Sequence, residues 1–255
     1  MSDNFKSVTV CDFEYEVAPG DLPNVLCMVA YVLNENLRHV STVRLWCGEF
    51  GSNPPFDVGP DSLFVAYSAW AEMTCFQRLG WKFPVHILDL HTAYLASSNL
   101  LLPYDPDQEK KREKPRKRLS DACRAYGIEG WEHIDKATIA EDIGNGNWCK
   151  YGRDMVFQYC EEDVRKSTEL LRAQVHGAGR FSPIDVPRVL HWSNYSAKAI
   201  ARVQARGMPI DMELWNLVQE NKAAVIAELI RQFDPSYGSP HPIYMPEGEW
   251  SNQRF

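Results

Sequence analysis

Val8–Tyr15, which reads VTVCDFEY, is the stretch that decides the fold. Its β-branched and aromatic residues alternate along the segment, and this period of two predicts a β-strand. Val25–Leu33 and Ser41–Cys47 have the same character, and turn-rich residues separate the three segments. Three strands at such short spacing predict an antiparallel meander.

Beyond the meander, apolar strands alternate with helical stretches. The predicted strand-and-helix pairs are Leu63–Tyr67 with Ala69–Leu79 and Val85–Leu90 with His91–Ser98, and two later helices are Leu119–Tyr126 and Arg153–Gln174. The last of these has good helix formers and lacks Gly and Pro. Three strands followed by alternating helix and strand predict an α/β fold, with a mixed central sheet flanked by helices.

The residue pattern changes after residue 180, where predicted strands no longer occur. Pro183 and Pro187 mark a linker, and helices are predicted at Arg188–Arg206 and Met212–Phe233. The tail that follows is rich in Pro and Gly. We therefore divide the chain into a main domain, residues 1–180, and a C-terminal helical extension, residues 181–255.

The composition is that of a soluble globular protein, with 45% apolar and 24% charged residues. The longest apolar run is about half of what a bilayer span needs, and the N-terminus lacks the layout of a signal peptide. We expect a cytoplasmic protein with no membrane partner. The seven cysteines are scattered without a C-x-x-C pair, which argues against a disulfide framework or structural zinc, and we assign them no chemical role.

The net charge of −7 argues against a nonspecific coat for nucleic acid. A local basic surface is present, however, because the segment Glu109–Arg118, EKKREKPRKR, holds seven Lys or Arg residues and two Glu. A charge run by itself is most simply a solvated loop. Its meaning depends on the residues around it.

Asp12 and Glu14 stand two apart on the first predicted strand, so both carboxylates point to one face. Paired carboxylates of this kind bind hard divalent cations such as Mg²⁺. Asp-x-Glu is also common on solvated strand faces, but here Val10, Cys11 and Phe13 surround the pair. These apolar neighbours indicate a central strand.

Two further segments carry acids at informative positions. Tyr159 and Asp163 are four apart on the long predicted helix, which stacks them one turn apart on one face. Glu72 lies at the start of a helix that follows a strand. Each has an ordinary alternative: a half-buried tyrosine with solvated acids in the first case, and a first-turn Glu favoured by the helix dipole in the second.

Taken together, the order and spacing of these segments resemble the tyrosine-bearing branch of the DEDD exonuclease superfamily, and are most similar to the proofreading domain of family A DNA polymerases. Asp12–Glu14 matches the first motif and Tyr159–Asp163 the third. The second motif corresponds to Ser68–Glu72, where Glu replaces the usual Asp. Leu119–Gly127 resembles the helix between the second and third motifs, and the resemblance covers Val8–Gln174.

This resemblance implies a ribonuclease H-like fold and 3′–5′ hydrolysis of DNA ends with two Mg²⁺ or Mn²⁺ ions. It implies that Asp12, Glu14 and Asp163 hold one ion, which activates a water, and that Asp12 and Glu72 hold the other, which stabilises the leaving oxygen. Tyr159 would orient the attacking water. The implied partners are a single-stranded DNA 3′ end and a polymerase domain, in cis or in trans.

Several residues are candidates for contacts with the nucleic acid. They are Phe13, Tyr67, Ser68 and Trp70 near the motifs, and Lys110, Lys111 and Arg112 in the basic run. The aromatic residues would stack on terminal bases, and the cations would hold phosphates. The aromatic residues are equally compatible with core positions.

The extension resembles the entry into a family A polymerase, with a Gly-x-x-x-Asp turn at Gly207–Asp211. The chain is thus either a fragment of a longer replicative enzyme, in a bacterial or phage-infected cytoplasm, or a free exonuclease with a helical appendage. Two rival functions stay open: an exoribonuclease of the same fold, and a catalytically weak domain that binds nucleic acid or scaffolds a polymerase.

Overall fold

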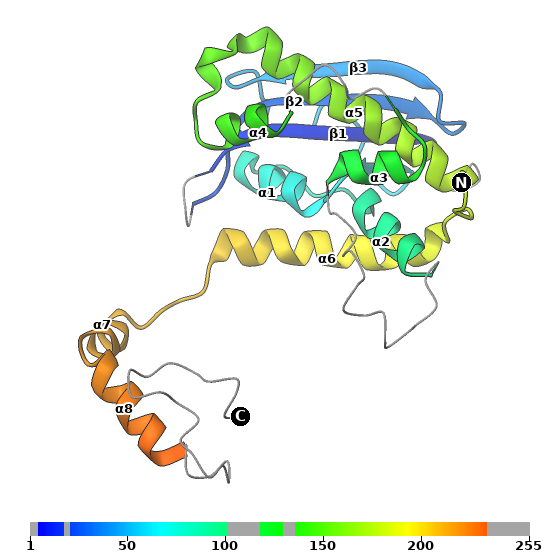
Figure 1. Cartoon of the computed structure of the whole chain (residues 1–255). Helices are drawn as coiled ribbons and strands as arrows, with labels where there is room; N and C mark the ends of the chain where they lie inside the picture. Colours follow the sequence, from blue (N-terminus) through cyan, green and yellow to red (C-terminus); the bar gives the residue numbers. More distant parts are fainter. Residues whose placement is uncertain (1–4, 18–20, 101–117, 130–135, 234–255) are drawn as a thin grey trace. The chain divides into compact units, whose positions relative to one another are not determined.

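The computed structural model describes residues 5–17, 21–100, 118–129 and 136–233. Its five strands form one sheet in the order β3-β2-β1-β4-β5 (Figure 1). The strands are β1 (Ser7–Glu16), β2 (Asn24–Asn34), β3 (His39–Trp46), β4 (Ser62–Ala66) and β5 (His86–Asp89). β1, β2 and β3 pair antiparallel, whereas β4 runs parallel to both β1 and β5.

The described residues also form helices. They are α1 (Trp70–Leu79), α2 (Leu90–Leu100), α3 (Leu119–Ala125), α4 (Lys136–Gly144), the 3₁₀ turn η2 (Trp148–Lys150), α5 (Gly152–His176), α6 (Val186–Arg206), α7 (Met212–Glu220) and α8 (Lys222–Phe233). A three-stranded meander followed by parallel strands with helices between them is the ribonuclease H-like arrangement. The predicted α/β fold with a mixed, helix-flanked sheet is therefore confirmed.

The two faces of β1 belong to different parts of the core. Val8 and Val10 pack in a cluster shared with α5, while Cys11 and Phe13 pack in a second cluster shared with α1. This follows from the alternation of side chains along a strand. Asp12 and Glu14 continue the Val8–Val10 face, so both carboxylates are directed to the side of the sheet that α5 covers.

The main compact unit ends at Gly207 rather than near residue 180. The sequence predicts a division at 180/181, but α6 packs against α1 and β5. Its buried face consists largely of small residues, with Ser193, Ala197 and Ala201 repeating every four positions. Residues of this size let the helix approach closely, and the Lys198 ammonium donates a hydrogen bond to the Val85 carbonyl at 3.0 Å.

Two local predictions differ from the structure. The single helix predicted at Met212–Phe233 is interrupted at Asn221, which ends α7 before α8 begins. The helix α4 was not predicted.

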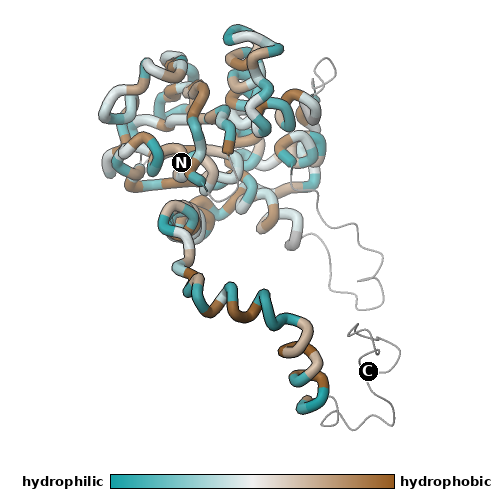
Figure 2. Tube along the Cα trace, turned by 90° about the vertical axis from the view of Figure 1, so that its left-hand side faces the viewer, coloured by the Kyte–Doolittle hydropathy of each residue, from teal (hydrophilic) through white to brown (hydrophobic). Residues whose placement is uncertain are grey.

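The second compact unit, Met208–Phe255, is described through α7 and α8. Asp211 caps α7 by accepting a hydrogen bond from the Leu214 amide at 3.0 Å. Apolar and polar residues alternate along both helices (Figure 2), and neither helix has a buried residue. Along the parts of the chain that the structure describes, no helix combines the length and the apolar composition that a membrane span requires.

Candidate active site

The site lies where β1 continues past the end of its pairing with the parallel strand β4. The pairing of β1 with β4 ends at Val10 and Val65, so Asp12 and Glu14 lie beyond the last paired residues. β4 ends at Ala66, and after a short turn the first turn of α1 carries Glu72. Glu72 is close enough for the charge of Asp12 to act on it, as the raised pKa of Glu72 reflects.

The long helix α5 carries the remaining predicted site residues, Tyr159 and Asp163. Its contacts with β1 and β2 hold it against the face that carries the two acids. Between α5 and β1 the Cys160 thiol donates a hydrogen bond to the backbone carbonyl of Asp12 at 3.4 Å. This contact helps to hold the flanking Tyr159 and Asp163 at the end of β1.

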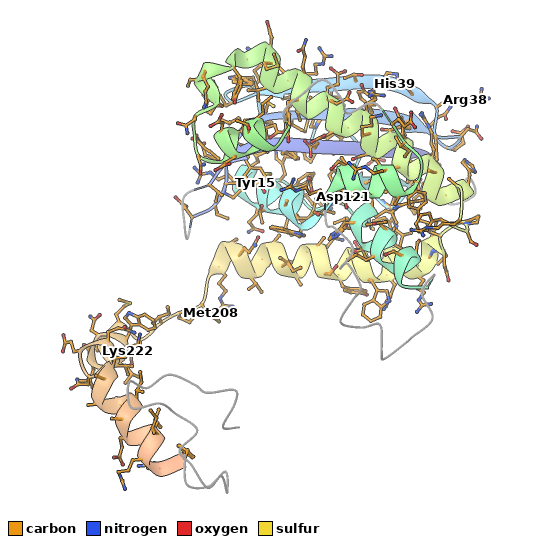
Figure 3. The ribbon with its side chains drawn as sticks, viewed as in Figure 1. Tyr15, Arg38, His39, Asp121, Met208 and Lys222 are labelled. Atoms are coloured by element: carbon orange, nitrogen blue, oxygen red, sulfur yellow. The ribbon has the colours of Figure 1, made fainter. Side chains whose placement is uncertain are left out.

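The five residues predicted for the chemistry line a single pocket of about 330 Å³, a volume at the lower end of small-molecule sites. They are Asp12, Glu14, Glu72, Tyr159 and Asp163. Tyr15, labelled in Figure 3, follows Glu14 on β1 and lines the same pocket. Ala140, Ile143 and Gly144, from α4 and its end, also line the pocket.

Burial sets the charge state of the two glutamates. Burial, followed by the charges of Asp12 and Asp163, raises the pKa of Glu14 well above its usual value, and Glu14 hydrogen-bonds to Asp12. Burial and the charge of Asp12 likewise raise the pKa of Glu72. Carboxylates so close together in a dry environment cannot all ionise without a compensating positive charge.

Glu72 gives a specific sign that a cation fits this pocket. Its side chain is only 4% exposed, and its Oε2 accepts no hydrogen bond from any residue that the structure describes. A buried carboxylate oxygen in that state costs free energy. An all-oxygen set next to such an atom is the donor chemistry that Mg²⁺ and Mn²⁺ prefer.

The phenol of Tyr159 stays protonated. Burial, and then the charges of Asp163, Glu14 and Asp12, raise its pKa above the ordinary value for tyrosine. At neutral pH the group is therefore a hydroxyl that can donate a hydrogen bond. That is the form required to orient a water molecule.

The predicted nucleic-acid contacts are only partly at the pocket. Tyr67 lines it, and Trp70 is 36% exposed at the start of α1. Ser68 adopts a left-handed backbone conformation, with φ of 64°, in the turn between them. Lys110, Lys111 and Arg112 lie outside the described residues, so the basic run stays a prediction.

The assignment of Phe13 to base stacking is corrected. Its side chain is 4% exposed and packs against Phe76 and Trp81, with ring centroids 6.0 and 6.2 Å away. Phe13 is among the residues that line the pocket, but its ring packs on the α1 side of the sheet, the opposite face to Glu14. Phe13 is a core residue, which was the alternative interpretation.

Sequence reasoning missed one residue that shapes the site. Asp89, at the end of β5, is buried, and its Oδ1 accepts hydrogen bonds from the amides of Ser68, His91 and Thr92. Burial raises its pKa, although these bonds act in the opposite direction. Asp89 thus ties the turn before α1 to the first turn of α2. An Asp two residues before the predicted helix His91–Ser98 is a capping signal that could have revealed it.

Comparison with known proteins adds distant structural likenesses. Neither a protein-family model nor a curated protein sequence matches this chain. Among solved structures, a chain of the "ExoI/SSB-Ct complex" matches with a TM-score of 0.42 and 12% identity, covering 74% of this chain and 43% of that chain. Cell-death related nuclease 4 (CRN-4) matches with a TM-score of 0.38 and 9% identity, covering 71% and 67%. This chain spans less than half the length of the first neighbour, and similarity at this level carries no argument about activity.

Proposed function

We propose that this protein is a divalent-metal-dependent 3′–5′ exonuclease that removes nucleotides from DNA ends. One observation carries the proposal: four acids and a tyrosine from three distant segments, Asp12, Glu14, Glu72, Tyr159 and Asp163, line one pocket. The segments are β1, the start of α1 and the middle of α5. Two of the acids, Glu14 and Glu72, are buried there.

The residues divide naturally into two cation sites that share Asp12. Asp12, Glu14 and Asp163 would hold one ion, and Asp12 with Glu72 would hold the other. Bound divalent cations supply a lowered pKa for water and a positive charge opposite the leaving oxygen. Glu72 is one methylene longer than the usual Asp, and its side chain is buried and lines the pocket, which supports its proposed role at the second ion.

The chain's own residues have separate roles in this proposal. The Tyr159 hydroxyl donates a hydrogen bond that orients the attacking water. The acids repel a phosphodiester when no cation is bound, so substrate binding and metal binding are coupled. Tyr67 lines the pocket and Trp70 is partly exposed at the start of α1, and in this proposal both stack on terminal bases.

Direction and substrate rest on the likeness of the motifs to proofreading exonucleases. We propose a single-stranded DNA 3′ end as substrate and a polymerase domain, in cis or in trans, as partner. This context corresponds to the cytoplasm of a bacterium or of a phage-infected cell.

The test is a time course on 5′-labelled single-stranded DNA, with and without Mg²⁺ or Mn²⁺. We expect a descending ladder only when metal is present, and none for Asp12→Ala. Glu162→Gln is the matched control on α5, because Glu162 pairs with Arg165 and does not line the pocket. A matched RNA oligonucleotide distinguishes the exoribonuclease. Metal-independent cleavage, or full activity of a folded Asp12→Ala variant, would contradict the proposal.

A further inference from the structure

A thiol lies beside two of the acids that line the pocket, although it does not line the pocket itself. Cys160 follows Tyr159 on α5, and its Sγ lies within 4.8 Å of a carboxylate oxygen of Asp12 and of one of Glu14. The two oxygens lie within the same distance of each other. Cys160 is completely buried, so its sulfur faces these groups and the neighbouring strands rather than solvent.

The spacing of these three atoms suits a metal ion. Ligand atoms about 2.0–2.3 Å from a tetrahedral ion lie about 3.3–3.8 Å from one another. A sulfur ligand changes the preference of the site, because thiolates select Zn²⁺ and similar soft cations, whereas all-oxygen sets suit Mg²⁺.

An independent feature of the same pocket points to a bound cation. The Oε2 atom of Glu72 is buried and accepts no hydrogen bond from residues 5–17, 21–100, 118–129 or 136–233. Glu72 lines the pocket together with Asp12 and Glu14. The pocket is therefore also lined by a buried carboxyl group, that of Glu72, with an oxygen that lacks a hydrogen-bond partner among the described residues.

We propose that Asp12, Glu14 and Cys160 form a mixed carboxylate–thiolate site that binds a thiophilic divalent cation, such as Zn²⁺, in preference to Mg²⁺. As the sulfur–metal bond forms, the thiol releases its proton to solvent, and no oxidant is required. The consequence for catalysis rests on the proposed function: Zn²⁺ at low concentration displaces Mg²⁺ from the first cation position. Binding itself is independent of that function.

The alternative is that Cys160 is only a packing residue. It joins α5 to β1 through the Asp12 carbonyl and also hydrogen-bonds to Cys27 on β2. A packing role predicts that the sulfur has no part in metal binding, and a spectroscopic probe of sulfur–metal bonds separates the two possibilities.

Cd²⁺ is the probe, because a cadmium–thiolate bond gives a ligand-to-metal charge-transfer band in the ultraviolet. The full chain is titrated with Cd²⁺ after its two exposed cysteines, Cys47 and Cys149, have been replaced by Ser to remove adventitious thiols. We expect a band that saturates at one equivalent. It should disappear in Cys160→Ala and Cys160→Ser and persist in Cys123→Ala, a matched control because Cys123 is also fully buried but is outside the cluster.

Competition with Zn²⁺ then measures selectivity by calorimetry. Cys160→Ala should lower the affinity for Zn²⁺ relative to Mg²⁺ by at least about tenfold, since removal of even an outer-sphere partner has effects of about 10- to 100-fold. Circular dichroism checks that both Cys160 variants are folded. A band that survives in the folded variants, or Cd²⁺ binding without any band, overturns the proposal.

The outcomes also separate this inference from the proposed function. A Cys160-dependent band in a protein without nuclease activity would support the metal site and reject the exonuclease. Metal-dependent nuclease activity without the band would support the exonuclease and reject the thiolate ligand.

Discussion

Replacing Glu72 by Gln should stabilise the metal-free protein at neutral pH. The wild-type carboxylate is buried beside Asp12, and its Oε2 has no hydrogen-bond partner in the described part of the chain. Gln has nearly the same shape, carries no charge, and offers an amide that can donate to Asp12. Leaving a buried polar group unsatisfied costs about 1–3 kcal/mol. For a unit of this size that difference corresponds to a rise in Tm of about 2–12 °C.

The pH dependence of this effect has a definite sign. Burial and Asp12 raise the pKa of Glu72 above its ordinary value of 4.5. A carboxyl group whose pKa is raised on folding contributes stability that is fully present below its unfolded pKa and is lost as the pH rises through the folded pKa. The free energy of unfolding of the wild-type protein thus falls above pH 4.5 as Glu72 ionises, and Glu72→Gln does not have this loss. The gap in Tm should be small near pH 4 and should widen towards pH 7.

Thermal unfolding followed by circular dichroism, in the presence of EDTA and at several pH values, measures this gap. Added Mn²⁺ should then raise the Tm of the wild-type protein more than that of Glu72→Gln, because binding to the folded state stabilises it by mass action. Glu162→Gln serves as the control, since loss of its partly exposed ion pair with Arg165 should change stability by about 1 kcal/mol. If Glu72→Gln is less stable than wild type at pH 7 without metal, the account of a costly buried carboxylate is wrong.

Three further predictions concern the chemistry, the scaffold and the substrate. Tyr159→Phe should reduce the cleavage rate by about 10- to 100-fold, because a positioned group that handles a proton contributes at least about this much. This loss should be smaller than that of Asp12→Ala. Equal losses in single-turnover assays would reject the orienting role. Asp89→Ala should lower the free energy of unfolding by about 1–3 kcal/mol in urea titrations, because the amides of Ser68, His91 and Thr92 lose their acceptor, and an unchanged midpoint would contradict this. Neutralising the basic run at 109–118 should flatten the salt dependence of DNA affinity, and an unchanged slope would show that the run does not contact phosphates.

Much of the main fold was accessible from local patterns. The strands at Val8–Tyr15 and Val25–Leu33 are identified by their alternation, and the long helix around Tyr159 by its composition and lack of breakers. Periodicity also shows which side chains share a face. It therefore grouped Asp12 with Glu14, and Tyr159 with Asp163, before any packing was known.

Local patterns did not determine what each face meets. Phe13 was a candidate for base stacking until the structure buried it against Phe76 and Trp81. α6 was assigned to the extension because prolines precede it, yet its small residues pack it onto the main unit. In each case the deciding contact joins residues far apart in the chain, and sequence periodicity contains no information about such contacts.

By itself, the sequence determined the elements and the two local pairs of functional side chains, because both depend on repeats of two or 3.6 residues. Tertiary structure alone decided that β4 ends early enough for Glu72 to come beside Asp12, and that α5 brings the Cys160 thiol against the acids of β1. The physical reason is that these encounters depend on how the helices pack across the sheet. Packing of that kind depends on the shapes of many side chains together and not on any one segment.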